Sequence, residues 1–216
     1  MPTASEVLTM ARVPGTSPMN TDQIIKSIEK QKMLGKVADT KLYQYLDTSV
    51  DEFASPVLAA VSVIEDGEGE KLEVAGAAVF NRSWFEGFLD ETDTRAMMIA
   101  SNKRTTTVIA LPQDPQGHYK SASVELFPNR VTTRPRYADG KAEVGIAIEA
   151  EISLTNLVGA STDKRQFKAI SEAVTRNAAI TLESQVAAMI EKTKGMKGAD
   201  VLGIGSMLQD RDPQTW

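Results

Sequence analysis

The chain of 216 residues contains no cysteine and a single histidine, His118. Without thiols there can be no disulfide, no thiolate nucleophile and no cysteine-based metal site. Metal sites usually combine several His, Cys or carboxylate ligands at definite spacing, and no such set is visible. His118 stands among the turn residues of PQDPQGHYK, so we expect it to be a solvated loop residue. The sequence predicts neither a metal site nor a bound cofactor.

Long apolar runs and an excess of positive charge are also missing. No segment reaches the roughly 18 apolar residues that a membrane-spanning helix needs, and MPTASEVLTM lacks the basic start and apolar core of a signal peptide. The formal net charge is -5, whereas nucleic-acid binders carry a basic face that neutralises phosphates. Nucleic acid is therefore excluded as an expected partner. Hydrophobic residues at 42% and charged residues at 25% are ordinary for a globular protein.

Catalytic motifs are absent as well. The chain has no phosphate-binding GKS or GKT motif, and its glycines are too sparse for a dinucleotide loop. Gly203 to Ser206 lacks the strand–turn–helix frame of a nucleophile elbow. Glu149 and Glu151 share one face of a predicted strand and could form a catalytic pair, but the solvent side of an amphipathic strand is the simpler interpretation. We expect a protein that is not an enzyme, with an unrecognised hydrolase as a minor alternative.

Residues 1–65 are predicted to form a small helical segment. One short helix is expected within MPTASEVLTM, and a second can be capped by Asn20 or Thr21 and ended by Gly35. A third ends before Pro56. Three short helices make a thin core, so we interpret residues 1–65 as part of a preceding domain and residues 66–216 as a C-terminal α+β domain.

Strand patterns begin near the end of that segment. Val57–Ile64 and Leu72–Phe80 read as a hairpin around a turn rich in glycine and acid. Asp90 begins a helix whose first turn carries Glu91 and Asp93, where the helix dipole favours anions. Two more strands are expected at 105–111 and 121–127.

The clearest local signal is Asp139-Gly140, the dipeptide that favours a two-residue hairpin turn. Beyond it, branched apolar residues alternate with acidic or small ones as far as Leu154, which is typical of a half-buried strand. A two-residue loop places Arg136 opposite Glu143 and Arg130 opposite Glu149. Such pairs contribute about 0.2–1 kcal/mol each and help to hold the register.

A long helix is predicted from Asp163 to about Lys194, ended by Gly195. At about 1.5 Å per residue it would be ~45 Å long, so it must cross a broad sheet or project beyond one. After Gly198, ADVLGIGSML reads as a last strand and turn. The predicted fold is α+β: a mainly antiparallel sheet packed by one long C-terminal helix and a shorter helix, with a small helical N-terminal segment. The apolar stripe of the long helix comprises Phe167, Ile170, Val174, Ala178, Leu182, Val186 and Ile190.

Three aromatic residues, Trp84, Phe85 and Phe88, stand close together in the sequence. They can form a binding patch, or a core or inter-domain contact, and the sequence leaves both interpretations open.

Two stretches resemble the C-terminal domain of the C subunits of spore germinant receptors, the GerC-type spore germination lipoproteins. The first is AGAAVFNRSWFEGFLDETDTRAMMI and the second is GADVLGIGSMLQDRDPQTW. The order of elements between them also fits that family. The matching positions are Gly76, Val79, Phe80, Gly87, Phe88, Leu89, Thr94, Arg95, Asp200, Gly203 and Trp216.

The resemblance implies a lipoprotein on the outer face of the spore inner membrane. It would act beside two integral-membrane subunits, A and B, in the response to nutrients, and it would carry no catalytic residues. Members of that family begin with a signal peptide and a lipid-bearing cysteine, which this sequence lacks. We therefore expect a soluble portion of a longer, lipid-anchored protein. The alternative function is a soluble domain that binds the small-molecule nutrient itself.

Overall fold

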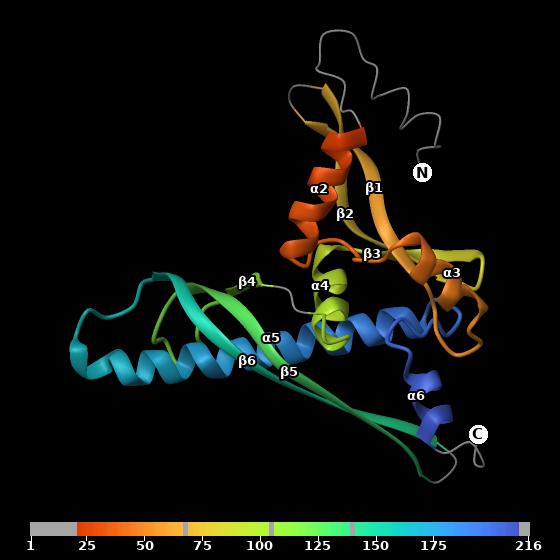
Figure 1. Ribbon diagram of the computed structural model, residues 1–216. Helices are drawn as coiled ribbons and strands as arrows, with labels where there is room; N and C mark the ends of the chain where they lie inside the picture. Colours follow the sequence, from red (N-terminus) through yellow and green to blue (C-terminus); the bar gives the residue numbers. More distant parts are fainter. Residues whose placement is uncertain (1–20, 67–68, 104–105, 139–140, 212–216) are drawn as a thin grey trace.

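The computed structural model describes residues 21–66, 69–103, 106–138 and 141–211. Two three-stranded sheets share a long helix, and shorter helices flank them (Figure 1). The predicted α+β class is confirmed. The first helix expected from the sequence, within MPTASEVLTM, lies outside the described residues, and so does Trp216. The elements are α2 (Thr21–Met33), α3 (Leu42–Val50), β1 (Val57–Asp66), β2 (Gly69–Asn81), β3 (Trp84–Leu89), α4 (Glu91–Ala100), β4 (Thr107–Leu111), β5 (Ser121–Ala138), β6 (Lys141–Val158), α5 (Phe167–Lys194) and α6 (Ile204–Arg211).

The first sheet has the strand order β1-β2-β3 with antiparallel pairing throughout. Its β1–β2 hairpin is the one predicted from the two apolar runs on either side of a turn rich in glycine and acid. An isolated parallel bridge joins Val37 to Gly76, so the connection after α2 lies against β2. The pairing of β1 with β2 runs across residue 65, and the proposed domain division at that residue stays a prediction.

The second sheet has the order β4-β5-β6, also antiparallel. Arg136 pairs with Glu143 and Arg130 with Glu149, as the two-residue loop requires, although residues 139–140 lie outside the description. The expected strand at 121–127 does not end there. It continues through a register shift between Pro128 and Arg130 into one 18-residue strand, because a bulge absorbs the irregularity without breaking the ladder.

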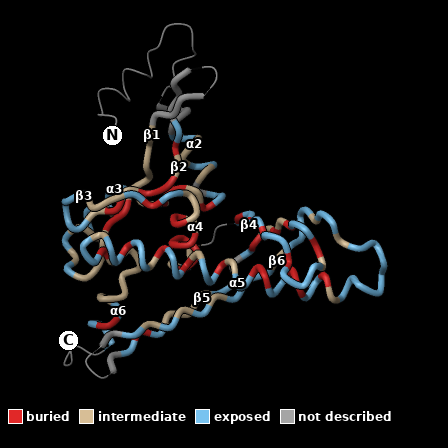
Figure 2. Tube along the Cα trace, turned by 180° about the vertical axis from the view of Figure 1, so that it is seen from behind, coloured by how far each residue is buried: buried red, intermediate tan, exposed pale blue. Residues whose placement is uncertain are grey.

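Helix α5 runs past both sheets and alongside α4, which stands between them (Figure 1). Asp163 caps the preceding 3-10 turn through its side chain, and Gly195 follows the last helical residue, as predicted. Lys192 of α5 forms an ion pair with Asp93 of α4. Figure 2 shows buried residues along β2 and α4, at intervals along α5, and on the β4 side of the second sheet. The far part of the β5–β6 ribbon is mostly exposed or half-buried there.

Two expectations about this part of the chain are wrong. Phe167 is 71% exposed, because it is the first residue of α5 and lies beyond the packed length of the stripe. The segment after Gly198 is a turn followed by helix α6 instead of a strand. The Asp200 carboxylate accepts hydrogen bonds from the backbone N–H groups of Leu202 (3.2 Å) and Gly205 (2.7 Å), which favours a helix start at this place.

Candidate interaction site

Phe85 and Phe88 of β3 form an exposed ring pair with centroids 4.9 Å apart. They are 42% and 41% exposed. Phe80 of β2 stands edge-on to Phe85 at 5.8 Å, and Tyr45 of α3 stands edge-on to Phe80 at 5.4 Å. These four residues, Tyr45, Phe80, Phe85 and Phe88, are called the aromatic patch below.

A bulge in β3 explains why Phe85 and Phe88 share a face. Residues three apart on a regular strand point to opposite sides. Here Phe85 pairs with Phe80 and Gly87 pairs with Val79, so Glu86 is an extra residue that shifts the alternation. The carboxylate of Glu86 lies 3.5 Å from Lys197 Nζ, and its side chain is only 6% exposed. The bulge is therefore held from the C-terminal part of the chain.

Trp84 does not join the patch. It pairs with Asn81 next to a tight turn, so by alternation its side chain lies on the other face of the sheet from Phe85. At 77% it is nevertheless one of the most exposed large apolar residues in the described chain. The structure thus brings together two of the three aromatic residues that the sequence groups, and adds Tyr45 and Phe80, which are distant in sequence from each other.

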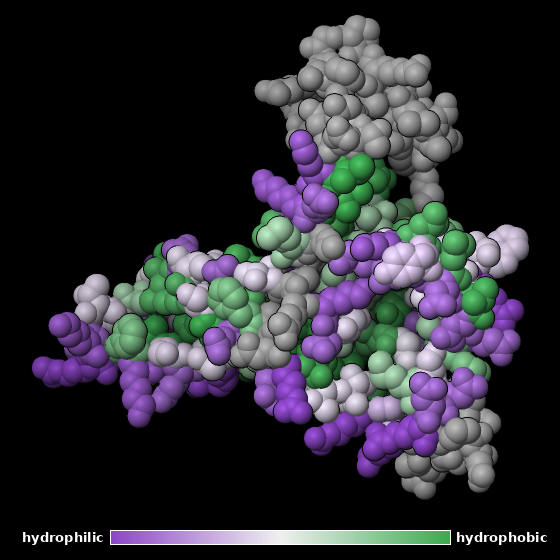
Figure 3. All heavy atoms as spheres, in the orientation of Figure 1, coloured by the Kyte–Doolittle hydropathy of each residue, from purple (hydrophilic) through white to green (hydrophobic). Residues whose placement is uncertain are grey.

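Helix α3 extends the apolar surface. No residue of α3 is buried, and apart from Tyr45 its large apolar side chains are exposed. In the region where Figure 1 draws α3 and β3, Figure 3 shows hydrophobic residues among hydrophilic ones. Exposed apolar residues in a cluster, unlike single scattered ones, mark contact surfaces. The exposed large apolar residues of α3 are Leu42, Tyr43, Leu46 and Val50.

Several of the positions that match the family in sequence shape the strands that carry the aromatic patch. Gly76 has φ +82, and a Cβ atom placed there would lie 2.4 Å from the backbone oxygen of Leu89, so β2 and β3 can approach only with glycine. Gly87 lies close to Met196, which would be 3.0 Å from an added Cβ. Leu89 is buried, and Thr94, also buried, reaches its carbonyl. These positions shape the sheet.

Arg95 of α4 connects that helix to the second sheet. Its guanidinium donates to the carbonyl of Val108 in β4, at 3.4 Å. Burial lowers the pKa of Arg95, and the carboxylates of Glu91 and Asp90 oppose this effect. Arginine keeps its positive charge despite this lowered pKa. Arg95 therefore links α4 to β4 through a charged hydrogen-bond donor.

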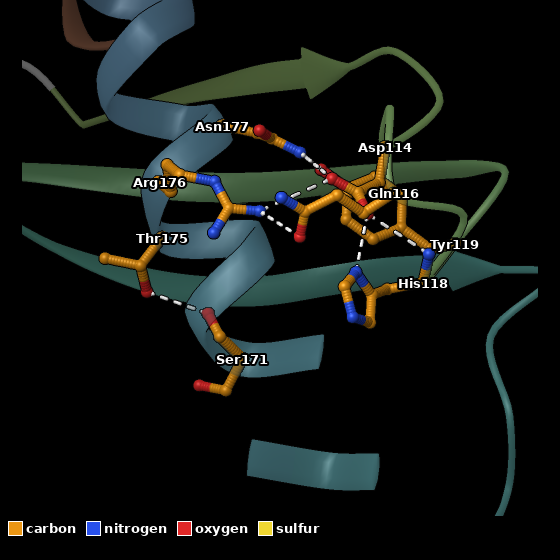
Figure 4. Close-up of polar contacts among 8 residues, drawn as sticks. All are labelled: Asp114, Gln116, His118, Tyr119, Ser171, Thr175, Arg176 and Asn177. Atoms are coloured by element: carbon orange, nitrogen blue, oxygen red, sulfur yellow. Dashed lines mark hydrogen bonds and ion pairs between the residues drawn. The ribbon is translucent and has the colours of Figure 1, made fainter. Parts of the chain in front are cut away.

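His118 corrects the prediction of a solvated loop residue. Its side chain is 28% exposed, and Nδ1 lies 2.6 Å from the carboxylate of Asp114, which is completely buried (Figure 4). The backbone N–H of His118 donates to the same carboxylate oxygen, at 3.1 Å. Asn177 of α5 donates to its other oxygen at 2.9 Å and approaches the hydroxyl of Tyr119 at 2.6 Å. Local sequence shows a turn here but gives no sign of the partner on α5, which is 63 residues away.

Burial alone would raise the pKa of Asp114, but the hydrogen bonds from Asn177 and His118 outweigh it and lower the pKa to about 2. Both carboxylate oxygens already have donors, and Arg176 lies 3.7 Å from one of them. A carboxylate satisfied in this way fastens the β4–β5 loop to α5. Because the carboxylate is completely buried and a donor reaches each of its oxygens, we assign the cluster a structural role.

The structure also shows where the acidic pair considered for catalysis lies. Glu149 and Glu151 are both exposed on β6, as the solvated-face interpretation predicts. Across the described ranges, no group of three or more His, Asp or Glu residues is arranged to hold a metal ion. None of the helices in that part of the chain is long and apolar enough to cross a membrane.

Comparison with known proteins agrees with the resemblance seen in the sequence. The model of the family "Spore germination B3/ GerAC like, C-terminal" matches residues 75–216. A solved structure titled "Crystal Structure of the GerBC protein" is similar in fold, with a TM-score of 0.56 and 13% identity. The similarity covers 80% of this chain and 52% of that one, so the present chain spans about half of its length. No curated protein matches the chain.

Proposed function

Since the chain belongs to the spore germination B3/GerAC-like C-terminal family, we propose that it is a non-catalytic part of the C subunit of a nutrient germinant receptor. Its role in spore germination would be exerted through surfaces. The observation that carries this proposal is the aromatic patch: rings are displayed on a sheet edge, and a bulge and two tightly placed glycines hold that edge in shape.

The partners we propose are the integral-membrane A and B subunits. Aromatic side chains are enriched at protein interfaces because they bury a large area at a small cost in conformational entropy. In the full-length protein, a lipid anchor would hold the domain at the outer face of the spore inner membrane. The exposed apolar side of α3 supports the further proposal that residues 1–65 belong with a preceding domain.

Germination of spores tests the role of the patch. We expect Phe85→Ser with Phe88→Ser to slow the response to nutrient, because the apolar contact with the partner is lost while the buried core is untouched. The matched control is Phe167→Ser, which removes an equally large exposed ring at the start of α5. Receptor levels are measured by immunoblot in each strain. A normal response of the double variant at normal receptor level would remove the patch from the proposal.

A second candidate function has one observation in its favour. A polar cleft of about 390 Å³ lies between α3, the end of α4 and the turn at Asp200. Hydroxyl, amide, carboxylate and ammonium groups line it, which is the chemistry of a site for a small polar nutrient. Calorimetry against amino acids and sugars decides this candidate: binding that Thr48→Leu abolishes supports it, and no heat with any of them removes it. The polar lining residues include Thr40, Gln44, Asp47, Thr48, Ser55, Ser101 and Lys103.

A further inference from the structure

A groove of about 470 Å³ lies between the β6 strand and helix α5, away from the aromatic patch. From β6 it is lined by Val144, Ile146 and Ile148, and from α5 mainly by apolar and small residues. No residue of β5 lines it, although β5 is the partner of β6 in the sheet. The groove therefore lies under the β6 side of the sheet, and within the described strands the other edge of β6 is unpaired. The residues from α5 are Ala179, Leu182, Glu183, Val186, Ala187 and Ile190.

The two outer edges of the β5–β6 ribbon differ in kind. Beyond the part paired with β4, β5 carries Arg130, Arg134, Pro135 and Arg136. Charged side chains and proline are the usual means by which an edge strand avoids pairing with another chain. Residues 143–154 of β6 contain no proline, and their only charged side chains are those of Glu143, Glu149 and Glu151. These carboxylates oppose an acidic strand but not a basic one. This stretch is an edge that can accept a further strand.

Charge on β6 indicates what kind of strand it accepts. Glu143 and Glu149 alternate with the groove-lining residues of β6, so their side chains lie on the face of the sheet opposite the groove. Glu183 of α5 lines the groove itself. Glu149 and Glu183 form no ion pair with any described residue. An incoming strand with basic side chains on its outer face would meet Glu149 there, whereas Glu143 on the same face is already paired with Arg136. Cross-strand pairs of opposite charge are stabilising.

A second copy of this chain fits less well. Two β6 edges paired about a two-fold axis would place Glu143, Glu149 and Glu151 of each copy along one face of the joint sheet. Like charges opposite or diagonal to one another across strands are destabilising. Pairing β6 of one copy with β5 of the next would match the charges, but it would require the proline-bearing edge of β5 and would not close.

From this geometry we propose that β6 and α5 form a docking site for an extended basic segment of another protein, which adds as a strand to the free edge of β6. Its alternate apolar side chains fill the groove over Ala179 and Ala187, where small residues leave room. Its basic side chains lie beside Glu149. The segment needs about seven residues, enough to pair with residues 143–149, which include the groove-lining residues of β6 and Glu149. The site is separate from the aromatic patch and does not depend on the receptor assignment.

The probe for the test is a nine-residue peptide of alternating valine and lysine, acetylated, amidated and fluorescently labelled. We expect it to bind the purified chain, and a valine–glutamate peptide of the same length to bind at least about tenfold more weakly. Amide exchange measured by NMR should slow at residues 143–150 on binding, because new backbone hydrogen bonds form there.

Two alanine variants supply the matched pair. Ala187→Phe fills the groove and should weaken binding at least about tenfold, whereas Ala188→Phe, also exposed on α5 but outside the lining, should change it less than about twofold. The proposal is overturned by failure to bind at about 1 mM peptide, by equal binding of the two peptides, or by equal effects of the two variants. Dimers of the free chain that Ala187→Phe dissolves would likewise overturn it in favour of a second copy.

Discussion

The Asp114 cluster and the aromatic patch depart in opposite directions from the usual arrangement of polar surface and apolar interior. Asp114 is completely buried and ionised, with donors on both oxygens. Phe85 and Phe88 are about two-fifths exposed, although they carry large apolar rings. The first arrangement is complete within the chain, because both oxygens of the buried carboxylate have donors from the protein. The second is incomplete, because the rings contact one another on one side and solvent on the other.

This difference teaches which of the two features belongs to stability and which to function. A buried carboxylate with a full set of donors is costly to disturb and gains nothing from an outside molecule. An exposed ring pair adds little to the folded state and gains when a partner covers it. Substitutions in the Asp114 cluster should therefore lower the stability of the fold, whereas substitutions of Phe85 and Phe88 should weaken the interaction with a partner.

The largest effect is expected for Asn177→Leu. The leucine is similar in size but donates no hydrogen bond, so one oxygen of the buried Asp114 loses its close donor and the Tyr119 hydroxyl loses its neighbour. The free energy of unfolding should fall by about 3 kcal/mol, as measured by urea denaturation. Ser184→Leu, at an exposed position of α5, is the control and should change it by less than about 0.5 kcal/mol. Equal effects of the two changes would deny the cluster its stabilising role.

Acid should act on the same cluster. The pKa of Asp114 is about 2 in the folded chain, against about 3.9 for a free aspartate. As the pH falls, the unfolded chain takes up this proton first, so the stability that Asp114 contributes above about pH 5 is lost as the pH falls towards 2. Urea midpoints measured over this range should fall more steeply for the native sequence than for Asp114→Asn. Parallel pH profiles would contradict the assignment.

An intermediate loss of stability is expected for Phe80→Ala, because Phe80 joins the patch to β2 and contacts both Tyr45 and Phe85. The half-buried ring and its two edge-on contacts should contribute about 2 kcal/mol to the free energy of unfolding. Thermal unfolding followed by circular dichroism measures the loss. A change below about 0.5 kcal/mol would show that the patch is not anchored to the sheet in the way the ring geometry indicates.

The smallest effect on stability is expected for Trp84→Ser, since the indole is 77% exposed. The free energy of unfolding should change by less than about 0.5 kcal/mol, as for other surface substitutions. Urea denaturation of the purified variant measures it, with the native sequence alongside. A larger loss of stability would mean that Trp84 is part of the packed structure. It would contradict the view that the exposed aromatic residues contribute little to the stability of the fold.

Local patterns were enough to predict much of the fold. The Asp139-Gly140 dipeptide and the alternation after it gave the register of Arg136 with Glu143, because a two-residue loop leaves only one pairing. The helix from Asp163 and its end at Gly195 followed from capping rules. The family positions could be found by resemblance, although their structural roles could not.

What the sequence could not show depends on contacts between distant residues. Helix α6 was missed because its start is fixed by the side chain of Asp200 bonding to Gly205 and not by helix propensity. His118 was misread because its environment comes from a buried aspartate and from Asn177 on another element. The shared face of Phe85 and Phe88 depends on a bulge at Glu86, which strict alternation does not predict.

Site-specific photo-crosslinking in spores tests the central claim most directly. A photoreactive phenylalanine at position 85 of the full-length protein is expected to form a covalent product that antibodies identify as the A or B subunit, whereas the same residue at position 167 forms none. Failure at position 85 in spores that still germinate normally, or equal crosslinking from both positions, would contradict the account.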